Sequence, residues 1–414
     1  MNKKRLEKEG SKWIKEGIIS EEQLQAILNR YVKEDKSYLL VVLSALLVSI
    51  SIIVFIFSDW SDITNVSRIT VMILMMFIFY VSGFYFERKN PGKNQTESPG
   101  KKQTYSRSQI IGISLIVLGY VTFGATLLLT LYVYDVQLMS AWPFTVWSLV
   151  GIMLYIIVPN RFLFTVALLV TIYGQFHQSL TNATFDYFIF FLFFFVYFHY
   201  AYHRGNSIIR YIFSIGLTLQ LLLLTINELS NFYWFMLFLL VIYGLSIVLP
   251  KDTFRKQMMQ VTVLSLLFYK IFETITIQET YTLENLTLQP SFFIFHTIFF
   301  FGIAFLLLLI NRKELITLLL FIPLFFLPIA YLFIIISLFL YSIYWMIYGF
   351  QKDDNNKMIL GIFSFLLSVF TVIVQYAWET INKSLFFLIA GLILFGISVL
   401  LERRRRKEEG DTNR

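Results

Sequence analysis

The chain has 414 residues, of which 57% are hydrophobic and 14% are charged. Soluble proteins carry about 25% charged residues and roughly 45–50% apolar ones, so both values indicate a chain that lies largely in lipid. They exclude a soluble enzyme, a disordered chain and a collagen-like chain. The net charge of +8 does not predict a nucleic-acid partner, because the basic residues lie beside apolar runs. The sequence has no cysteine, which excludes disulfides and thiolate metal sites.

Residues 1–37 are predicted to form a cytosolic helical hairpin. Its first helix ends at Gly17, a residue that tolerates the positive φ of a helix C-terminus. Its second helix begins with the capping box Ser20-Glu21-Glu22-Gln23, which Ile19 and Leu24 flank as a hydrophobic staple. The hairpin either orders the first span or docks a cytosolic partner protein. The candidate docking residues are Trp13, Gly17, Ile19, Ser20 and Gln23.

Residues 38–401 are predicted to form an all-α polytopic transmembrane domain, because a membrane-spanning helix needs about 20 apolar residues and such runs recur throughout. The first run is too long for a cleavable signal peptide, so we expect it to act as an uncleaved signal-anchor. A flexible cytosolic linker is predicted over 88–108, and a basic cytosolic tail over 402–414. About 14 spans are predicted: 38–57, 67–86, 110–132, 142–158, 162–176, 187–203, 208–225, 232–249, 258–274, 292–310, 314–327, 330–349, 358–377 and 384–401.

The basic residues predict the orientation of these spans. If the N-terminus is cytoplasmic, 31 of the 34 Lys and Arg residues fall in cytoplasmic segments, and only Arg68, Lys270 and Lys383 do not. This bias is the positive-inside pattern of membrane proteins. It predicts a multi-pass protein of the cytoplasmic membrane, in contact with the lipid bilayer, with both termini in the cytoplasm.

Two segments are hard to assign from the sequence. As one straight helix, 314–349 would be about 54 Å long, against about 30 Å for the hydrocarbon core. Pro323 and Pro328 predict a break, so the segment is either two short passes or a re-entrant pair. Apolar and polar residues alternate at the start of 273–291, which favours a short strand or an extended loop.

Both ends of the chain resemble one protein family. The motifs are Trp13-x-x-x-Gly17-x-Ile19-Ser20-x-x-Gln23 and a closing span that begins Lys383-Ser384-Leu385-Phe386-Phe387 and ends Leu401-Glu402-Arg403-Arg404-Arg405-Arg406. They resemble a bacterial family of polytopic predicted membrane proteins, domain of unknown function twenty-one fifty-seven. The resemblance implies a membrane protein and assigns no activity.

Charged residues in the middle of a span would mark a functional site, because their burial in lipid is unfavourable. The sequence has almost none, which argues against a proton pump with an embedded carboxylate relay. Lys270 and Glu273 come closest and are spaced to pair on one helix face. The other candidate polar residues on the outer face are Asp59, Asp62 and Asp135. The amides of Gln220, Gln260 and Gln375 either bond neighbouring helices or line a pathway.

The sequence gives little indication of a metal site or of catalytic residues. His199 and His203 share one helix face, as a metal pair would, but no acid or cysteine lies near them in the sequence to complete a site. We therefore expect no metal, no cofactor and no catalytic residue.

Three functions are open. The number of predicted spans and the short loops favour a carrier or flippase-like transporter. The alternative is a non-transporting scaffold or sensor whose hairpin docks a partner. The third is an intramembrane enzyme that acts on a lipid-linked substrate.

Overall fold

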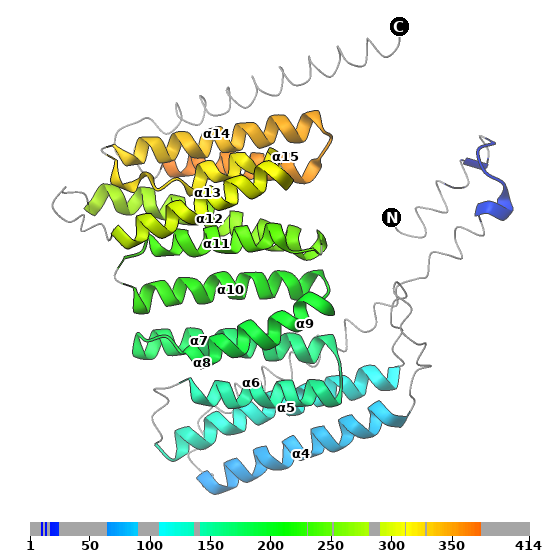
Figure 1. The fold of residues 1–414 in the computed structure, drawn as a ribbon. Coiled ribbons are helices and arrows are strands. Elements are labelled where there is room, and N and C mark those ends of the chain that lie inside the picture. The colour runs from blue at the N-terminus through cyan, green and yellow to red at the C-terminus, as the bar shows by residue number, and fades with distance from the viewer. Residues whose placement is uncertain are drawn as a thin grey trace. The chain divides into compact units, whose positions relative to one another are not determined.

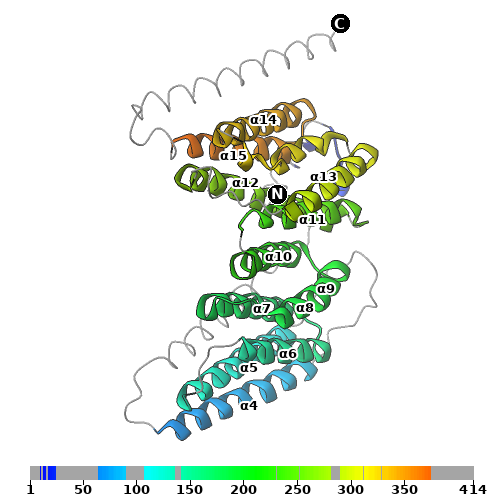
Figure 2. The same cartoon turned by 60° about the vertical axis from the view of Figure 1, so that its left-hand side comes forward.

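The computed structural model of the chain describes residues 10, 13–14, 17–24, 64–89, 107–135, 141–229, 231–250, 252–280, 290–310, 312–327 and 329–373 (Figures 1 and 2). Every regular element within these ranges is a helix, as the apolar runs predict. Several sequence predictions lie outside the described residues: the spans 38–57 and 384–401, the tail 402–414, most of the linker 88–108, Asp59, Asp62 and Gln375.

Every predicted span from 67–86 to 358–377 except 314–327 is mostly helical over its described residues. In the described part of the chain, six of these helices are long and apolar enough to cross a membrane. Those six are α4 (Asn65–Lys89), α5 (Arg107–Val133), α10 (Ser207–Glu228), α13 (Pro290–Ile310), α14 (Ala330–Gln351) and α15 (Asn355–Val372). The all-helical architecture is therefore confirmed for the described residues, with six candidate membrane-spanning helices, and the count of about 14 spans stays a prediction.

The remaining helices are shorter or more polar. They are α6 (Trp142–Ile157), α7 (Arg161–Asn182), α8 (Tyr187–Leu192), α9 (Phe198–His203), α11 (Trp234–Val248) and α12 (Asp252–Thr280). A π-helical turn, η1 (Phe193–Tyr197), joins α8 to α9, so the predicted span 187–203 is one helix with a bulge in its middle.

The chain divides into two compact units, and the division runs through α6 and α7. In the first unit, α4 and α5 lie side by side and antiparallel (Figure 1). Gly83 and Gly112 allow the close approach: a Cβ on Gly112 would lie 2.5 Å from the backbone nitrogen of Glu87. Small residues commonly let helices pack closely in membranes.

Reciprocal hydrogen bonds join α5 to α6 in the same unit. The Tyr120 hydroxyl donates to the Trp147 carbonyl at 3.0 Å, and the Trp147 indole N–H donates to the Tyr120 carbonyl at 3.0 Å. The indole occupies the space that Gly124 leaves, because a Cβ there would lie 1.9 Å from the ring. Gly124 is thus required for close helix packing, as its position in an apolar run suggests.

The second unit contains the chain from Leu168 onward, and α14 and α15 form an antiparallel hairpin within it (Figure 2). Between α13 and α14 the chain forms two 3-10 helices, η3 (Arg312–Phe321) and η4 (Leu324–Phe326). The predicted span 314–327 is therefore not an α-helix. Pro323 lies between the two 3-10 segments, and Ile329 has a left-handed φ of 64° before α14 begins.

One local prediction was wrong. The segment that alternates apolar and polar residues after Glu273 is helical through Thr280 as part of α12. The Thr274 hydroxyl donates to the Lys270 carbonyl one turn earlier at 2.7 Å, so this polar side chain is satisfied within the helix. No strand or extended loop is present in 252–280.

The N-terminal turn has a helix-ending motif at Gly17, whose φ is 72°. The Gly17 N–H donates to the Ile14 carbonyl at 3.1 Å, and the Ile18 N–H donates to the Trp13 carbonyl at 2.9 Å. This pair of bonds is the Schellman motif, in which a left-handed glycine satisfies the last carbonyls of a helix.

The capping box that follows is also confirmed. The Ser20 N–H donates to Gln23 Oε1 at 3.0 Å, and the Gln23 N–H donates to Ser20 Oγ at 3.2 Å. Leu24 is buried against Ile19, which is the predicted staple contact. The location of this turn in the cytosol and its role in docking stay predictions.

Candidate functional site

The 3-10 helix η3 is the most irregular element of the second unit. Ten residues of 3-10 helix are unusual, because side chains eclipse every third residue and most runs end after three or four. The start of η3 and the segment just beyond its end contact different neighbouring helices. Near its start, the Tyr344 hydroxyl in the last turns of α14 donates to the Lys313 carbonyl at 3.3 Å. Beyond its end, Phe325 stacks on Tyr233, just before α11, with ring centroids 5.1 Å apart.

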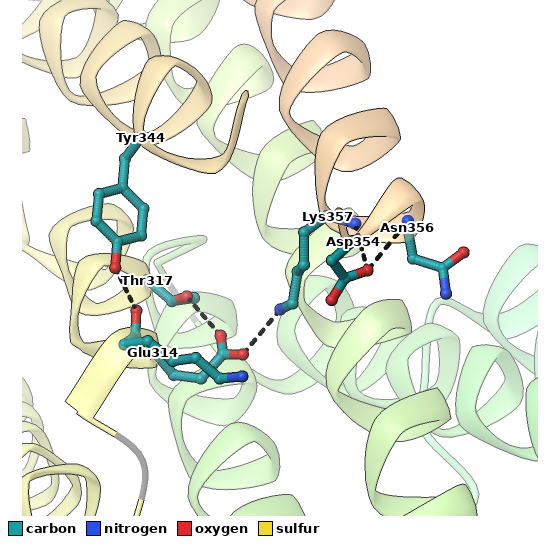
Figure 3. Close-up of polar contacts among 7 residues, drawn as sticks. Glu314, Thr317, Tyr344, Asp354, Asn356 and Lys357 are labelled. Atoms are coloured by element: carbon teal, nitrogen blue, oxygen red, sulfur yellow. Dashed lines mark hydrogen bonds and ion pairs between the residues drawn. The ribbon is translucent and has the colours of Figure 1, made fainter. Parts of the chain in front are cut away.

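A partly buried ion pair lies at the start of η3 (Figure 3). Glu314 Oε1 is 2.8 Å from Lys357 Nζ on the first turn of α15, and Glu314 is only 5% exposed. The Thr317 hydroxyl donates to the other carboxylate oxygen at 3.5 Å. Asp354 caps α15 by accepting from the Lys357 backbone N–H at 3.3 Å, which fixes the position of the lysine. Such a pair is stable only while both charges are present.

Aromatic side chains surround this ion pair. Lys357 Nζ lies 3.8 Å from the centroid of the Trp345 ring, a cation–π contact. Tyr243 and Tyr341 lie within electrostatic range of the Glu314 carboxylate. All three rings are fully buried, and the Trp345 N–H and both tyrosine hydroxyls form no well-aligned hydrogen bond among the described residues, although Thr317 lies within reach of both hydroxyls and Trp345 within reach of Tyr341. Buried polar groups are usually paired, so this cluster has unused hydrogen-bonding capacity. We call Glu314, Thr317, Tyr243, Tyr341 and Trp345 the Glu314 cage.

The α14–α15 hairpin brings these residues together because its helices pack at glycines. A Cβ on Gly349 would lie 2.4 Å from the backbone nitrogen of Met358, and one on Gly361 would lie 2.5 Å from that of Met346. The hydroxyls of Ser364 and Ser368 donate to backbone carbonyls one turn earlier in α15, so these side chains do not hold the two helices apart. Lys357 therefore reaches over the Trp345 ring with little space between the helices.

A second buried ion pair lies at the other end of η3. Lys270 Nζ is 2.7 Å from Glu273 Oε2, and the two side chains are 0% and 5% exposed. The predicted pairing is confirmed, and the pair is enclosed by neighbouring helices. Lys270 also donates to the Ile322 carbonyl, just beyond η3, at 3.2 Å. Glu273 Oε1 and His296 Nε2 are buried close by and have no hydrogen-bond partner in the described part of the chain.

The predicted pathway glutamines are not brought together. Gln220 is fully buried in α10, and neither polar atom of its amide has a partner within the described ranges. Gln260 is exposed on α12 and accepts from the Tyr211 hydroxyl at 2.5 Å. Tyr211 precedes Gln220 by nine residues, about 13 Å along α10. Asp135 lies exposed in the turn after α5, with a left-handed φ of 51°.

The histidine pair shows no metal-binding arrangement. The rings of His199 and His203 lie 4.4 Å apart, and His203 Nδ1 is 3.0 Å from the His199 carbonyl. No group of three or more acids, histidines and cysteines that could hold a metal is found among the described residues.

Sequence reasoning missed the Glu314 cage. Glu314 is the first residue of the predicted span 314–327 and directly follows Arg312 and Lys313, and Lys357 directly precedes the predicted span 358–377. Glu314, Lys270 and Glu273 are all buried, although each lies near an end of its predicted span rather than in the middle. The signal in the sequence was the lone acid at the first position of the predicted span 314–327.

These features define a polytopic helical membrane protein with paired charges buried between its helices. Residues 11–164 match the family model described as Predicted membrane protein (DUF2157), which confirms the resemblance for that part of the chain. The N-terminal motif lies within this match, and both buried ion pairs lie outside it. Neither a curated protein nor a solved structure matches the chain.

Proposed function

We propose that the protein is a carrier or flippase-like transporter of the cytoplasmic membrane, with both termini in the cytoplasm. The observation that carries the proposal is the 3-10 helix η3 with a buried ion pair at each end. The chain leaves the α-helical form over η3 and is irregular at Pro323, and irregular backbone at membrane depth occurs where it is enclosed by protein or lines a water-filled cavity. Broken helices of this kind form the binding sites of many secondary transporters.

The two ion pairs serve as gates in this proposal. Glu314 with Lys357 closes the end of η3 next to the α14–α15 turn, which carries the exposed Lys352 and is predicted to be cytoplasmic. Lys270 with Glu273 closes the opposite end. Paired ionisable residues inside a bundle commonly mark transport pathways. Opening one pair at a time would expose the middle of η3 to one side and then to the other.

Buried amides support a polar route through the unit. Gln220 has an amide with no described partner, and an amide without partners in an apolar core is unfavourable unless water or a ligand bonds to it. We propose that Gln220 lines the pathway, with Gln260 and Gln375 as the other candidates that the sequence indicates.

The main alternative is a scaffold whose hairpin docks a cytosolic protein. It is favoured by Ile18, which is 63% exposed beside the rigid Gly17 turn. Deletion of residues 1–36 would then remove a co-purifying partner while insertion into the membrane is unchanged. Identical partners for the deleted and full-length chains would refute docking.

Gate opening can be measured without knowing the substrate. Spin labels on cysteines at Lys313 and Lys352, both exposed, report the separation of η3 from the α14–α15 turn by dipolar spectroscopy. The proposal predicts two distance populations, and Glu314→Gln should enrich the longer one because it removes the ion pair. A control pair at Phe333 and Gln351, both on α14, should give one unchanged distance. A single distance at the gate, unaffected by Glu314→Gln, would contradict the proposal.

A further inference from the structure

We propose that the Glu314 cage is a binding site for a primary ammonium group, and that Lys357 occupies it as a tethered competitor. An ammonium group is already bound in the cage: Lys357 Nζ lies 2.8 Å from Glu314 Oε1 and 3.8 Å from the Trp345 ring centroid. A carboxylate opposite an indole face is a favourable environment for an alkylammonium. The lysine side chain has the same chemistry as a free alkylamine or an aminoethyl lipid headgroup.

The cage has more binding capacity than Lys357 uses. The lysine ammonium has three donors, and only Glu314 accepts from it among the described residues. The hydroxyls of Tyr243 and Tyr341 form no well-aligned hydrogen bond and both lie within reach of Thr317, so they can turn to accept from a ligand. The Trp345 N–H can donate to a polar group next to the ligand's ammonium. A small polar amine can therefore form more hydrogen bonds in the cage than the lysine side chain does.

The cage can also be reached. Lys357 is 24% exposed and stands on the first turn of α15, whereas Lys270 in the other ion pair is 0% exposed. Withdrawal of Lys357 toward solvent leaves an opening where its stem had been. A soluble amine enters by this opening, and so does the headgroup of a lipid, because both present the same ammonium.

The assignment of the substrate class rests on the transport function proposed above. The existence of the binding site does not depend on that function. The test therefore measures binding alone. Lys357→Ala empties the cage and leaves Glu314 buried without its cation. Propylammonium chloride should then raise the melting temperature of purified Lys357→Ala saturably, by about 5 °C over the same concentration of sodium chloride. The double variant Glu314→Gln/Lys357→Ala should not respond, because it lacks the carboxylate.

The matched control is Lys270→Ala, which leaves an equally unpaired carboxylate with no opening to solvent. Propylammonium should not stabilise it. An equal response of Lys270→Ala, or a response of the double variant, would overturn the inference. If Lys357→Ala cannot be purified alone, propylammonium present throughout purification should restore a folded protein. A chain that stays unfolded at every amine concentration would also overturn it.

Two lipid compositions distinguish the source of the ammonium. If the ligand is a headgroup, Lys357→Ala should melt at a higher temperature in phosphatidylethanolamine nanodiscs than in phosphatidylglycerol nanodiscs, without added amine. If it is a soluble amine, the two should be equal and propylammonium should stabilise both. Lys357→Ala that responds to neither lipid nor amine refutes the site. If propylammonium binds but the spin labels report no gate opening, the proposed carrier function is refuted and the proposed binding site is not.

Discussion

Replacing Lys270 by Met should be among the most destabilising single substitutions in the second unit. The change removes the ammonium 2.7 Å from Glu273 Oε2 and the hydrogen bond to the Ile322 carbonyl, and leaves a carboxylate that is only 5% exposed. Breaking a buried pair by removing one partner costs about 3–5 kcal/mol. For a unit of this size, that free energy corresponds to a fall in melting temperature of about 10 °C.

A double variant separates the effect of the charge from the loss of packing. Lys270→Met/Glu273→Met removes both charges and keeps similar volumes. The melting temperature of this double variant should therefore be much closer to the wild-type value than the melting temperature of Lys270→Met is. Arg312→Met, at an exposed position, should shift it little. Thermal unfolding in one detergent provides all four values. The reasoning is refuted if the double variant melts as low as Lys270→Met, or if Lys270→Met shifts the melting temperature by less than about 2 °C.

Three further predictions concern packing and topology. Gly361→Ala should destabilise by about 1–3 kcal/mol in the same melting assay, because its Cβ would lie 2.5 Å from a backbone nitrogen. Gly302→Ala, with nothing within 4 Å, should be neutral or stabilising, and the opposite ranking would contradict the α14–α15 packing. Tyr120→Phe should lower the free energy of unfolding by about 0.5–1.5 kcal/mol, because it removes the hydrogen bond to α6. An unchanged melting temperature would exclude that bond. A cysteine at Asp135 should react with an impermeant thiol reagent from outside the cell and one at Asn94 should not; the reverse would invert the predicted orientation.

Features set by neighbouring residues were predictable from the sequence. The capping box of Ser20 and Gln23 formed because both bonds join residues three apart. Lys270 and Glu273 paired for the same reason. The helix over 187–203 was also expected, because its apolar run is long and bounded by polar residues.

Features set by distant residues were not predictable. Glu314 and Lys357 are 43 residues apart, and nothing in one sequence indicates that η3 and α15 meet. The 3-10 helix 312–321 packs against α13 and α14, and its sequence has the same apolar character as an α-helical span. The alternation after Glu273 was misleading, because a short period-two pattern is weaker than the continuation of an established helix.

The central claim is that the middle of η3 is reached alternately from the two sides of the membrane. Thr317→Cys tests it directly, because Thr317 is fully buried between the two ion pairs and the chain has no other cysteine. Labelling by a charged, impermeant thiol reagent is compared in right-side-out and inverted vesicles, with the equally buried Ser368→Cys as the control. The account predicts that Thr317→Cys reacts from both sides and faster than Ser368→Cys. Reaction from one side only, or no faster than at position 368, would contradict it.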